Sequence, residues 1–182
     1  MILGAAGAKV VGRCIDLGEE KRVKYPPQPF DALELGASFE HGPREVSRAD
    51  IAEFARLSGD MTALHTDEQY AAGTPLKGLV AHGALSLAVA TGLAYEMGIF
   101  EEVVLAFRGL SASYQNPVRP GDQLSLALTV AALDERPRPG RGRVELAADL
   151  RNQEGRQVLS GTWKLLIRRQ LLDSASEPQQ RL

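Results

Sequence analysis

Two kinds of hydrophobic periodicity occur along the chain, one helical and one typical of strands. From residue 48 to 57 apolar positions recur at helical spacing, and Ser47 and Asp50 in front of them form a capping box, which predicts a short amphipathic helix. Residues 83–97, GALSLAVATGLAYEM, are apolar around almost the whole helical circumference. This second helix is therefore expected to be buried.

In the second half of the chain apolar positions alternate with polar ones, which is the pattern of strands with one buried face. Four such runs follow one another, at residues 103–114, 124–130, 143–150 and 163–167. Turn-forming segments rich in proline, glycine and asparagine separate them. In the first run the alternation changes phase at Gly109, where we expect a bulge or a sharp bend. Four long strands in succession predict an antiparallel meander.

A buried helix and a sheet with one apolar face can cover each other if the sheet curls around the helix. This is an α+β fold of the hot-dog type, a single domain with an antiparallel sheet wrapped around a central helix. The same order of elements also suits other α+β layers. We expect the domain to span residues 31–172, with residues 1–30 as an N-terminal tail and linker and residues 173–182 as a flexible C-terminal tail.

Composition narrows the classes of function. The 182 residues fit one domain, and the formal net charge of −2 comes without a block of like charges, so neither nucleic acid nor a membrane surface is an expected partner. Cys14 is the only cysteine, which excludes an intramolecular disulfide and agrees with a reducing compartment. No run approaches the roughly 20 apolar residues that a membrane helix needs. A soluble, cytoplasmic protein is expected.

The densest polar cluster is SGDMTALHTD, residues 58–67, between the two expected helices. Asp60 and His65 in this cluster can act as acid and base if they converge on one water. The alternative is structural: Asp60 caps a turn, and His65 precedes a short helix that Thr66 begins with Gln69 as its capping-box partner. The spacing of the pair leaves both interpretations open.

The segment Ala81-His82-Gly83 stands at the entrance of the buried helix. Unpaired amides at a helix N-terminus are good donors to a developing oxyanion, and glycine lets a ligand approach the backbone closely. A thioester carbonyl would suit this place. For the His82 side chain, a structural hydrogen bond to a neighbouring strand is the preferred interpretation.

Two other classes of site find no support in the sequence. His41, His65 and His82 do not have a metal-binding spacing, and no carboxylate-rich cluster joins them, so no metal is expected. The chain also lacks a G-x-S-x-G motif, so a hydrolase that works through an acyl-serine is not indicated.

Residues 54–93 resemble the MaoC-like dehydratases and the (R)-specific enoyl-CoA hydratases, whose motif reads approximately G-D-x-N-P-x-H-x-D followed by a spaced H-G. The segment NPVRPGD, residues 116–122, is similar to the P-V-x-x-G-D turn of that family. Together the resemblance covers about residues 36 to 168. The chain departs from the pattern at Thr62-Ala63, where the family has Asn-Pro.

The resemblance implies a hot-dog subunit that pairs with a second copy, so that the sheet extends across a homodimer. It implies reversible hydration of trans-2-enoyl thioesters to (R)-3-hydroxyacyl thioesters, without a cofactor, on acyl-CoA or an acyl-carrier thioester. By position, Asp60 and His65 would be the catalytic pair and Gly83 the amide that polarises the thioester oxygen. Thr91 would support the site through its hydroxyl, and His82 would be a second supporting residue.

Two other functions are compatible with a hot-dog domain. A thioesterase of this fold often carries an acid on the central helix, where this chain offers only Glu96 near the end. A non-catalytic acyl-CoA-binding subunit would suit the altered Thr62-Ala63, although Asp60, His65 and Gly83 are intact.

Overall fold

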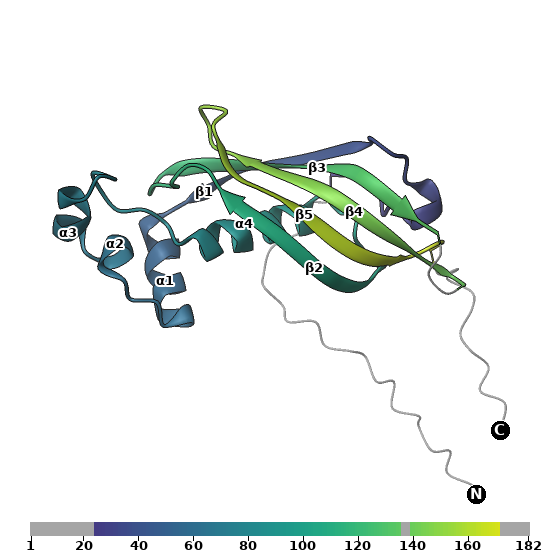
Figure 1. The fold of residues 1–182 in the computed structure, drawn as a ribbon, viewed down its shortest axis with the longest axis horizontal. Coiled ribbons are helices and arrows are strands. Elements are labelled where there is room, and N and C mark those ends of the chain that lie inside the picture. Colours follow the sequence, from purple (N-terminus) through teal and green to yellow (C-terminus); the bar gives the residue numbers. More distant parts are fainter. Residues whose placement is uncertain (1–23, 136–138, 172–182) are drawn as a thin grey trace, which may run out of the picture.

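The fold is known from a computed structural model that describes residues 24–135 and 139–171. In these residues a single antiparallel sheet has the strand order β1-β3-β4-β5-β2, and helix α4 packs along one face of it (Figure 1). The helices are η1 (Phe30–Ala32), α1 (Arg48–Ser58), α2 (Ala63–Thr66), α3 (Glu68–Gly73) and α4 (Gly83–Glu96). The strands are β1 (Ser38–Val46), β2 (Val104–Tyr114), β3 (Asp122–Asp134), β4 (Arg141–Arg151) and β5 (Gln157–Arg168).

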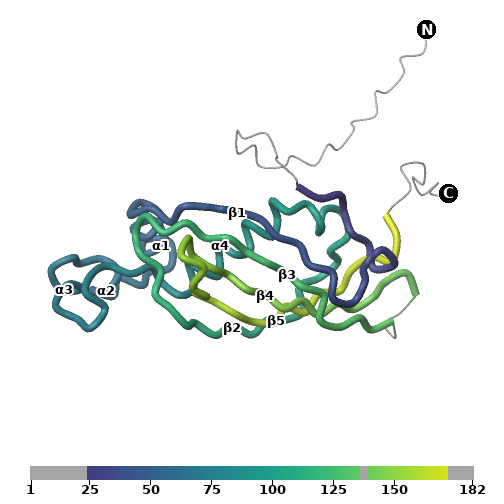
Figure 2. The backbone as a smooth tube through the Cα atoms, turned by 90° about the horizontal axis from the view of Figure 1, so that it is seen from above, coloured from purple at the N-terminus to yellow at the C-terminus, as the bar shows by residue number. Residues whose placement is uncertain are grey.

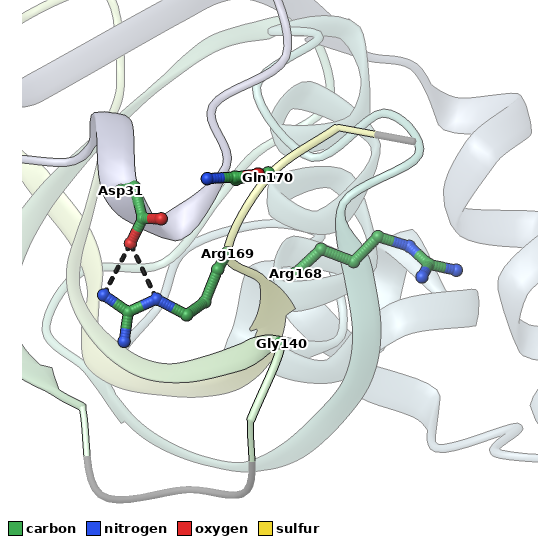
Figure 3. A pocket seen from close by; sticks show the side chains of 5 residues that line it. All are labelled: Asp31, Gly140, Arg168, Arg169 and Gln170. Carbon is green, nitrogen blue, oxygen red and sulfur yellow. Dashed lines mark hydrogen bonds and ion pairs between the residues drawn. The ribbon is translucent and has the colours of Figure 1, made fainter. Parts of the chain in front are cut away.

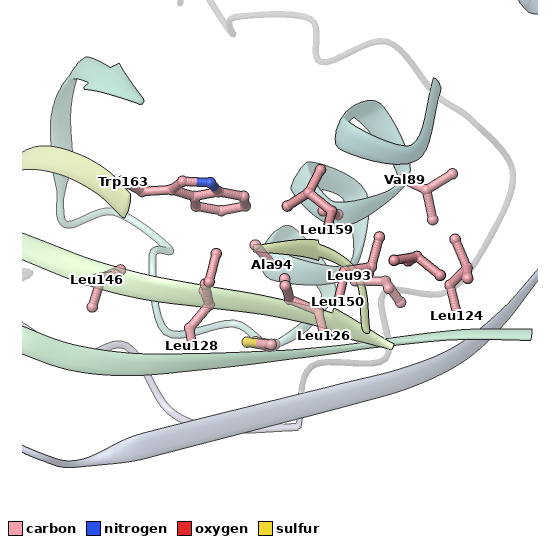
Figure 4. Close-up of a cluster of buried hydrophobic side chains, with 14 of the residues drawn as sticks. Val89, Leu93, Ala94, Leu124, Leu126, Leu128, Leu146, Leu150, Leu159 and Trp163 are labelled. Carbon is pink, nitrogen blue, oxygen red and sulfur yellow. The ribbon is translucent and has the colours of Figure 1, made fainter. Parts of the chain in front are cut away.

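The core lies between α4 and the inner face of β3, β4 and β5 (Figure 4). Alternate residues of β3 and β4 are buried, as the period-two pattern predicts. On α4, Val89 and Leu93 point into this layer, and Trp163 of β5 fills it further along the sheet. The expected α+β architecture, with a sheet curled around a central helix, is confirmed.

One expectation about the strands was wrong, and one strand was missed. The sequence predicts a simple meander, but β2 pairs with β5 and not with β3, its neighbour in the chain. Only β3, β4 and β5 follow one another as a meander. The register of β2 against β5 shifts between Phe107 and Gly109, which confirms the expected irregularity. The sequence reasoning also missed β1, which pairs with β3 at the opposite edge of the sheet.

Helix α4 is buried on one side only, whereas its composition predicts burial all round. Its buried residues include Leu85, Val89 and Leu93, but Ala84 and Ala88 on the other side are exposed in the single chain. Edge strand β2 likewise exposes large apolar side chains: Val104, Leu105, Phe107, Leu110 and Tyr114. The described chain therefore leaves an apolar helix face and an apolar edge strand uncovered.

Helices α1, α2 and α3 gather at one end of the sheet, next to the beginning of α4 (Figure 2). The predicted capping box of α1 is present: the Ser47 side chain accepts from the Asp50 amide at 3.1 Å, and the Ser47 amide donates to the Asp50 carboxylate at 2.7 Å. This cap fixes the start of α1.

The predicted domain boundaries remain predictions, because most of both predicted tails lies outside the described residues. Before η1, the chain is joined to the domain by backbone hydrogen bonds from Tyr25 to Met97 and from Gln28 to Ile99. Over residues 24–135 and 139–171, none of the helices has the length and apolar character needed to span a membrane.

Candidate active site

The end of α1 places Asp60 at the surface. Gly59 adopts a left-handed conformation, with φ of 78°, and its amide donates to the Ala55 carbonyl at 2.9 Å, which closes the helix. The Asp60 amide then donates to the Ser58 hydroxyl at 3.2 Å. The chain thus turns sharply away from α1, and the exposed Asp60 side chain is directed into the following turn.

The carboxylate of Asp60 is bound on one oxygen by Thr62. The Thr62 hydroxyl donates to Oδ1 at 2.6 Å, and the Thr62 amide donates to the same oxygen at 3.2 Å. The hydroxyl bond and then the amide bond lower the pKa of Asp60 below its ordinary value, and the nearby imidazoles of His82 and His65 add to the effect. Asp60 therefore does cap a turn, as the structural alternative predicts, and it is held as a carboxylate while doing so.

His65 lies on the single-turn helix α2 and is half-buried. Its Nδ1 is 2.8 Å from the Val80 carbonyl, and since a carbonyl only accepts, Nδ1 must carry the proton of this bond. In the neutral ring Nε2 is then left as an acceptor. Nε2, on the other side of the ring, can therefore act as a base.

Asp60 and His65 come close enough to share one water. A carboxylate oxygen of Asp60 and one ring nitrogen from each of His65 and His82 all lie within 4.8 Å of one another. A water that makes hydrogen bonds of about 2.8 Å to two acceptors can bridge roughly 5 Å. The pair that the sequence picked out is thus brought together in space by the turn at Gly59 and by α2.

His82 touches both members of the pair. It is only 3% exposed, its Nε2 donates to the Asp60 carbonyl at 3.0 Å, and its ring stacks on that of His65 with centroids 3.8 Å apart and 30° between the planes. The Phe54 ring packs on it at 5.1 Å. The expected hydrogen bond to a neighbouring strand was wrong, because the acceptor belongs to the loop after α1. Its Nδ1 is buried without a hydrogen-bond partner in the described part of the chain.

The grouping of Asp60, His65 and His82 also has the composition of a metal site. A zinc ion needs ligand lone pairs that converge on one point at about 2.0–2.2 Å. The His65 and His82 rings stack with centroids 3.8 Å apart, so their in-plane lone pairs lie in separate planes. The rings would have to separate before both could bind one ion, and so this arrangement favours acid–base chemistry.

The first turn of α4 supplies a donor beside the pair. His82 provides no side-chain cap, and within the described residues the Gly83 amide has no acceptor. A Cβ at Gly83 would lie 3.1 Å and 3.2 Å from ring carbons of Tyr114, at the end of β2. A side chain at this position would therefore press on the Tyr114 ring, which must shift by a few tenths of an ångström to admit it. Sequence reasoning missed Tyr114, since nothing in the linear pattern links it to Gly83.

The segment NPVRPGD holds the approach to α4 in place. The Val118 carbonyl accepts from the Ala81 amide at 2.8 Å, and the Arg119 guanidinium donates to the Leu76 carbonyl. The turn itself is closed by the Asp122 carboxylate, which accepts from the Arg119 amide at 2.7 Å. This motif therefore acts on the site through the loop that carries the Val80 and Gly83 backbone.

Other expected residues are not brought to the pair. Thr91 is exposed, its hydroxyl donates to the Ala88 carbonyl at 2.7 Å, and it lies about 12 Å along α4 from Gly83. Thr66 does not cap α3, because Asp67 does so by accepting from the Tyr70 amide at 2.9 Å. The Thr66 hydroxyl instead donates to backbone carbonyls of residues that precede it in the sequence.

Glu96 does not provide an acid next to Gly83. It lies about 20 Å along α4 from that glycine, and its carboxylate is 3.1 Å from His41 Nε2 on β1. A thioesterase arrangement with an acid beside the helix N-terminus is therefore not formed by Glu96.

A cavity of about 390 Å³ lies at the other end of the sheet from α1, α2 and α3 (Figure 3). Asp31, Gly140, Arg168, Arg169 and Gln170 line it. The Arg169 guanidinium is engaged by the Asp31 carboxylate at 2.7 and 2.8 Å, which raises the pKa of Arg169 above its ordinary value. Because Asp31 and Arg169 are already paired and the cavity does not include Asp60 or His65, the candidate active site is the cluster at the helix end of the sheet.

Comparison with known proteins identifies the family of the chain. Residues 31–149, more than half of the chain, match the family model of the MaoC like domain. The chain is 33% identical over 133 residues to a 3-hydroxybutyryl-CoA dehydratase of Methylorubrum extorquens, covering 70% of this chain and 74% of that protein. It is 32% identical over 104 residues to an (R)-specific enoyl-CoA hydratase of Aeromonas caviae, covering 57% and 75% of the two chains.

Among solved structures, the R-hydratase PhaJ1 of Pseudomonas aeruginosa superimposes with a TM-score of 0.68 at 28% identity, over 86% of this chain and 97% of the other. The matched family model spans both the polar cluster with Asp60 and His65 and the turn that holds α4. The chain belongs to the family of MaoC-like hot-dog proteins.

Proposed function

We propose that this protein reversibly hydrates trans-2-enoyl thioesters to (R)-3-hydroxyacyl thioesters. The observation that carries the proposal is the convergence of the Asp60 carboxylate and a His65 ring nitrogen within 4.8 Å, beside the free Gly83 amide at the start of α4. The relatives named as dehydratase and hydratase support the same reaction type. The substrate would be an acyl-CoA or an acyl-carrier thioester, and the proposed reaction uses no cofactor.

Asp60 and His65 are the proposed catalytic residues. They hold one water between the carboxylate and His65 Nε2, and its oxygen adds to C3 of the enoyl group. The proton lost by the water passes through this pair to C2, so the elements of water are added across the double bond. Charge that develops on the thioester oxygen is stabilised by the Gly83 amide, a type of donor whose loss typically costs about 2.7–4 kcal/mol in barrier.

Two residues are proposed to support the site. His82 links the Asp60 backbone to the His65 ring, as its contacts at 3.0 and 3.8 Å indicate. Thr91 is the second, and its hydroxyl donates within α4 on the exposed face of the helix.

We propose a homodimer in which β2 meets its copy and the sheet continues across the interface. Edge strand β2 leaves unpaired backbone groups and exposes Phe107, Leu110 and Tyr114. Exposed edges of this kind are templates for pairing with another chain, and an apolar patch beside them marks an interface. The single Cys14 agrees with a cytoplasmic enzyme.

The test is turnover of crotonyl-CoA and longer trans-2-enoyl-CoA substrates, followed by loss of the conjugated enoyl absorbance. Asp60→Asn and His65→Ala are the parallel variants, each expected to lower kcat by about 10²–10⁴-fold. Circular dichroism of each variant checks that the fold is intact. Chiral analysis of the product should give the (R)-3-hydroxy thioester. Saturable binding without turnover at any chain length would replace this proposal with a non-catalytic acyl-CoA binder, and release of free thiol would indicate a thioesterase.

A further inference from the structure

Thr62 occupies the position where the family pattern has asparagine, and in this chain it is bound directly to a catalytic group. Its hydroxyl and its amide both donate to Asp60 Oδ1, at 2.6 and 3.2 Å. No donor reaches Oδ2 within residues 24–135 and 139–171. The two carboxylate oxygens therefore have different environments.

The rest of the turn fixes the backbone that carries the carboxylate. The Asp60 amide donates to Ser58, and the Asp60 carbonyl accepts from His82 Nε2 at 3.0 Å, so the backbone is tied on both sides. The Thr62 carbonyl in turn accepts from the His65 amide at 2.9 Å, which begins the helical turn that carries the imidazole. Thr62 thus connects Asp60 and His65 through its side chain and its backbone.

We propose that Thr62 is a positioning residue of this active site, whose hydroxyl holds Oδ1 of Asp60 so that Oδ2 is presented to the reacting water. This inference rests on the proposed hydration reaction. In water a free carboxylate exchanges its two oxygens by rotation, and a short bond to an ionised oxygen opposes that rotation. The departure at Thr62-Ala63 then preserves the catalytic pair by means of a hydroxyl instead of an amide side chain.

The same bond also favours the ionised form of Asp60, and the groups that act on this carboxylate are Thr62 of the turn, His65 of α2 and His82 at the start of α4. Since these interactions lower the pKa of Asp60, the carboxylate form persists to lower pH than usual. Activity that needs the carboxylate is lost as the pH falls through that pKa. Removing the hydroxyl should move this acidic limb of the pH profile to higher pH.

The experiment compares Thr62→Val with Thr62→Ser. Valine keeps the shape and the backbone donor but loses the hydroxyl, whereas serine keeps the hydroxyl. We expect Thr62→Val to lower kcat by about tenfold, less than the roughly 10²–10⁴-fold contribution of a whole acid–base group, with KM within about twofold of wild type. We expect Thr62→Ser to retain wild-type kcat and the wild-type pH profile.

A titration of the Asp60 carboxyl carbon by ¹³C NMR, in wild type and in Thr62→Val without substrate, separates this inference from the proposed reaction. The expected result is a midpoint at lower pH in wild type. Identical midpoints, or a Thr62→Val enzyme with wild-type kcat and pH profile, overturn the role of Thr62. Loss of activity in Thr62→Ser equal to that in Thr62→Val overturns it as well, since the hydroxyl would then not be the relevant group. A wild-type protein that turns over no enoyl thioester refutes the reaction but leaves the NMR comparison decisive for the Thr62 contact.

Discussion

A substitution of His82 should lower kcat without a matching loss in the free energy of unfolding. Replacing it with leucine, which is of similar size, removes the hydrogen bond to the Asp60 carbonyl and the stack on His65. A lost hydrogen bond costs about 0.5–1.5 kcal/mol. The same substitution removes Nδ1, which is buried without a partner, and burial of an unpaired polar atom costs about 1–3 kcal/mol.

The two effects have opposite signs, so the free energy of unfolding of His82→Leu should stay within about 1 kcal/mol of wild type or rise by up to about 2 kcal/mol. Its kcat should nevertheless fall at least about tenfold, because both catalytic groups lose their common support. His82→Gln is the matched control, since its amide nitrogen can still donate to the Asp60 carbonyl, and it should retain more activity than the leucine variant.

Urea denaturation followed by circular dichroism measures the unfolding free energy, and crotonyl-CoA turnover measures kcat. The reasoning is refuted if His82→Leu turns over at the wild-type rate. A loss of more than about 2 kcal/mol in unfolding free energy would refute it too, because His82 would then be a stabilising core residue.

Three further substitutions test separate parts of the structure. Ser47→Ala removes the side-chain acceptor of the α1 cap and should lower the unfolding free energy by about 1 kcal/mol in urea denaturation, with kcat unchanged; an unchanged midpoint would contradict the cap's contribution. Gly83→Ala places a Cβ 3.1 Å from the Tyr114 ring and should lower kcat/KM in the crotonyl-CoA assay, and adding Tyr114→Ala should recover the part of the loss that is due to this contact. If Gly83→Ala alone leaves kcat/KM unchanged, the ring moves aside without cost. Leu110→Arg on β2 should convert dimers to monomers in light scattering; a dimer of unchanged mass would place the interface elsewhere.

Most elements were predictable because their signal is local. The cap at Ser47, the apolar stretch of α4 and the alternation in β3 and β4 each arise within a dozen residues, and the structure confirms them. Strand β1 was missed because its sequence, SFEHGPREV, has only Phe39 and Val46 as large apolar residues and contains Gly42-Pro43, so it shows no apolar alternation. The pairing of β2 with β5 instead of β3 was also missed, since both pairings suit the same local pattern.

The candidate active site was also predictable only in part. Asp60 and His65 could be proposed because they lie in one short polar cluster, and Gly83 because it opens a helix. The stack of His82 on His65 and the Tyr114 ring over Gly83 each join segments well separated in the chain. No spacing along the sequence indicates such contacts.

By itself, therefore, the sequence determined the fold class, the starts of α1 and α4 and the polar cluster that holds the proposed catalytic pair, because periodicity, caps and short motifs act over a few neighbouring residues. Only the tertiary structure decided which strands meet, which face of α4 stays open and how the Asp60 carboxylate is oriented. Those depend on contacts between distant segments, where several arrangements satisfy the same local pattern and only packing and hydrogen bonding in three dimensions select one.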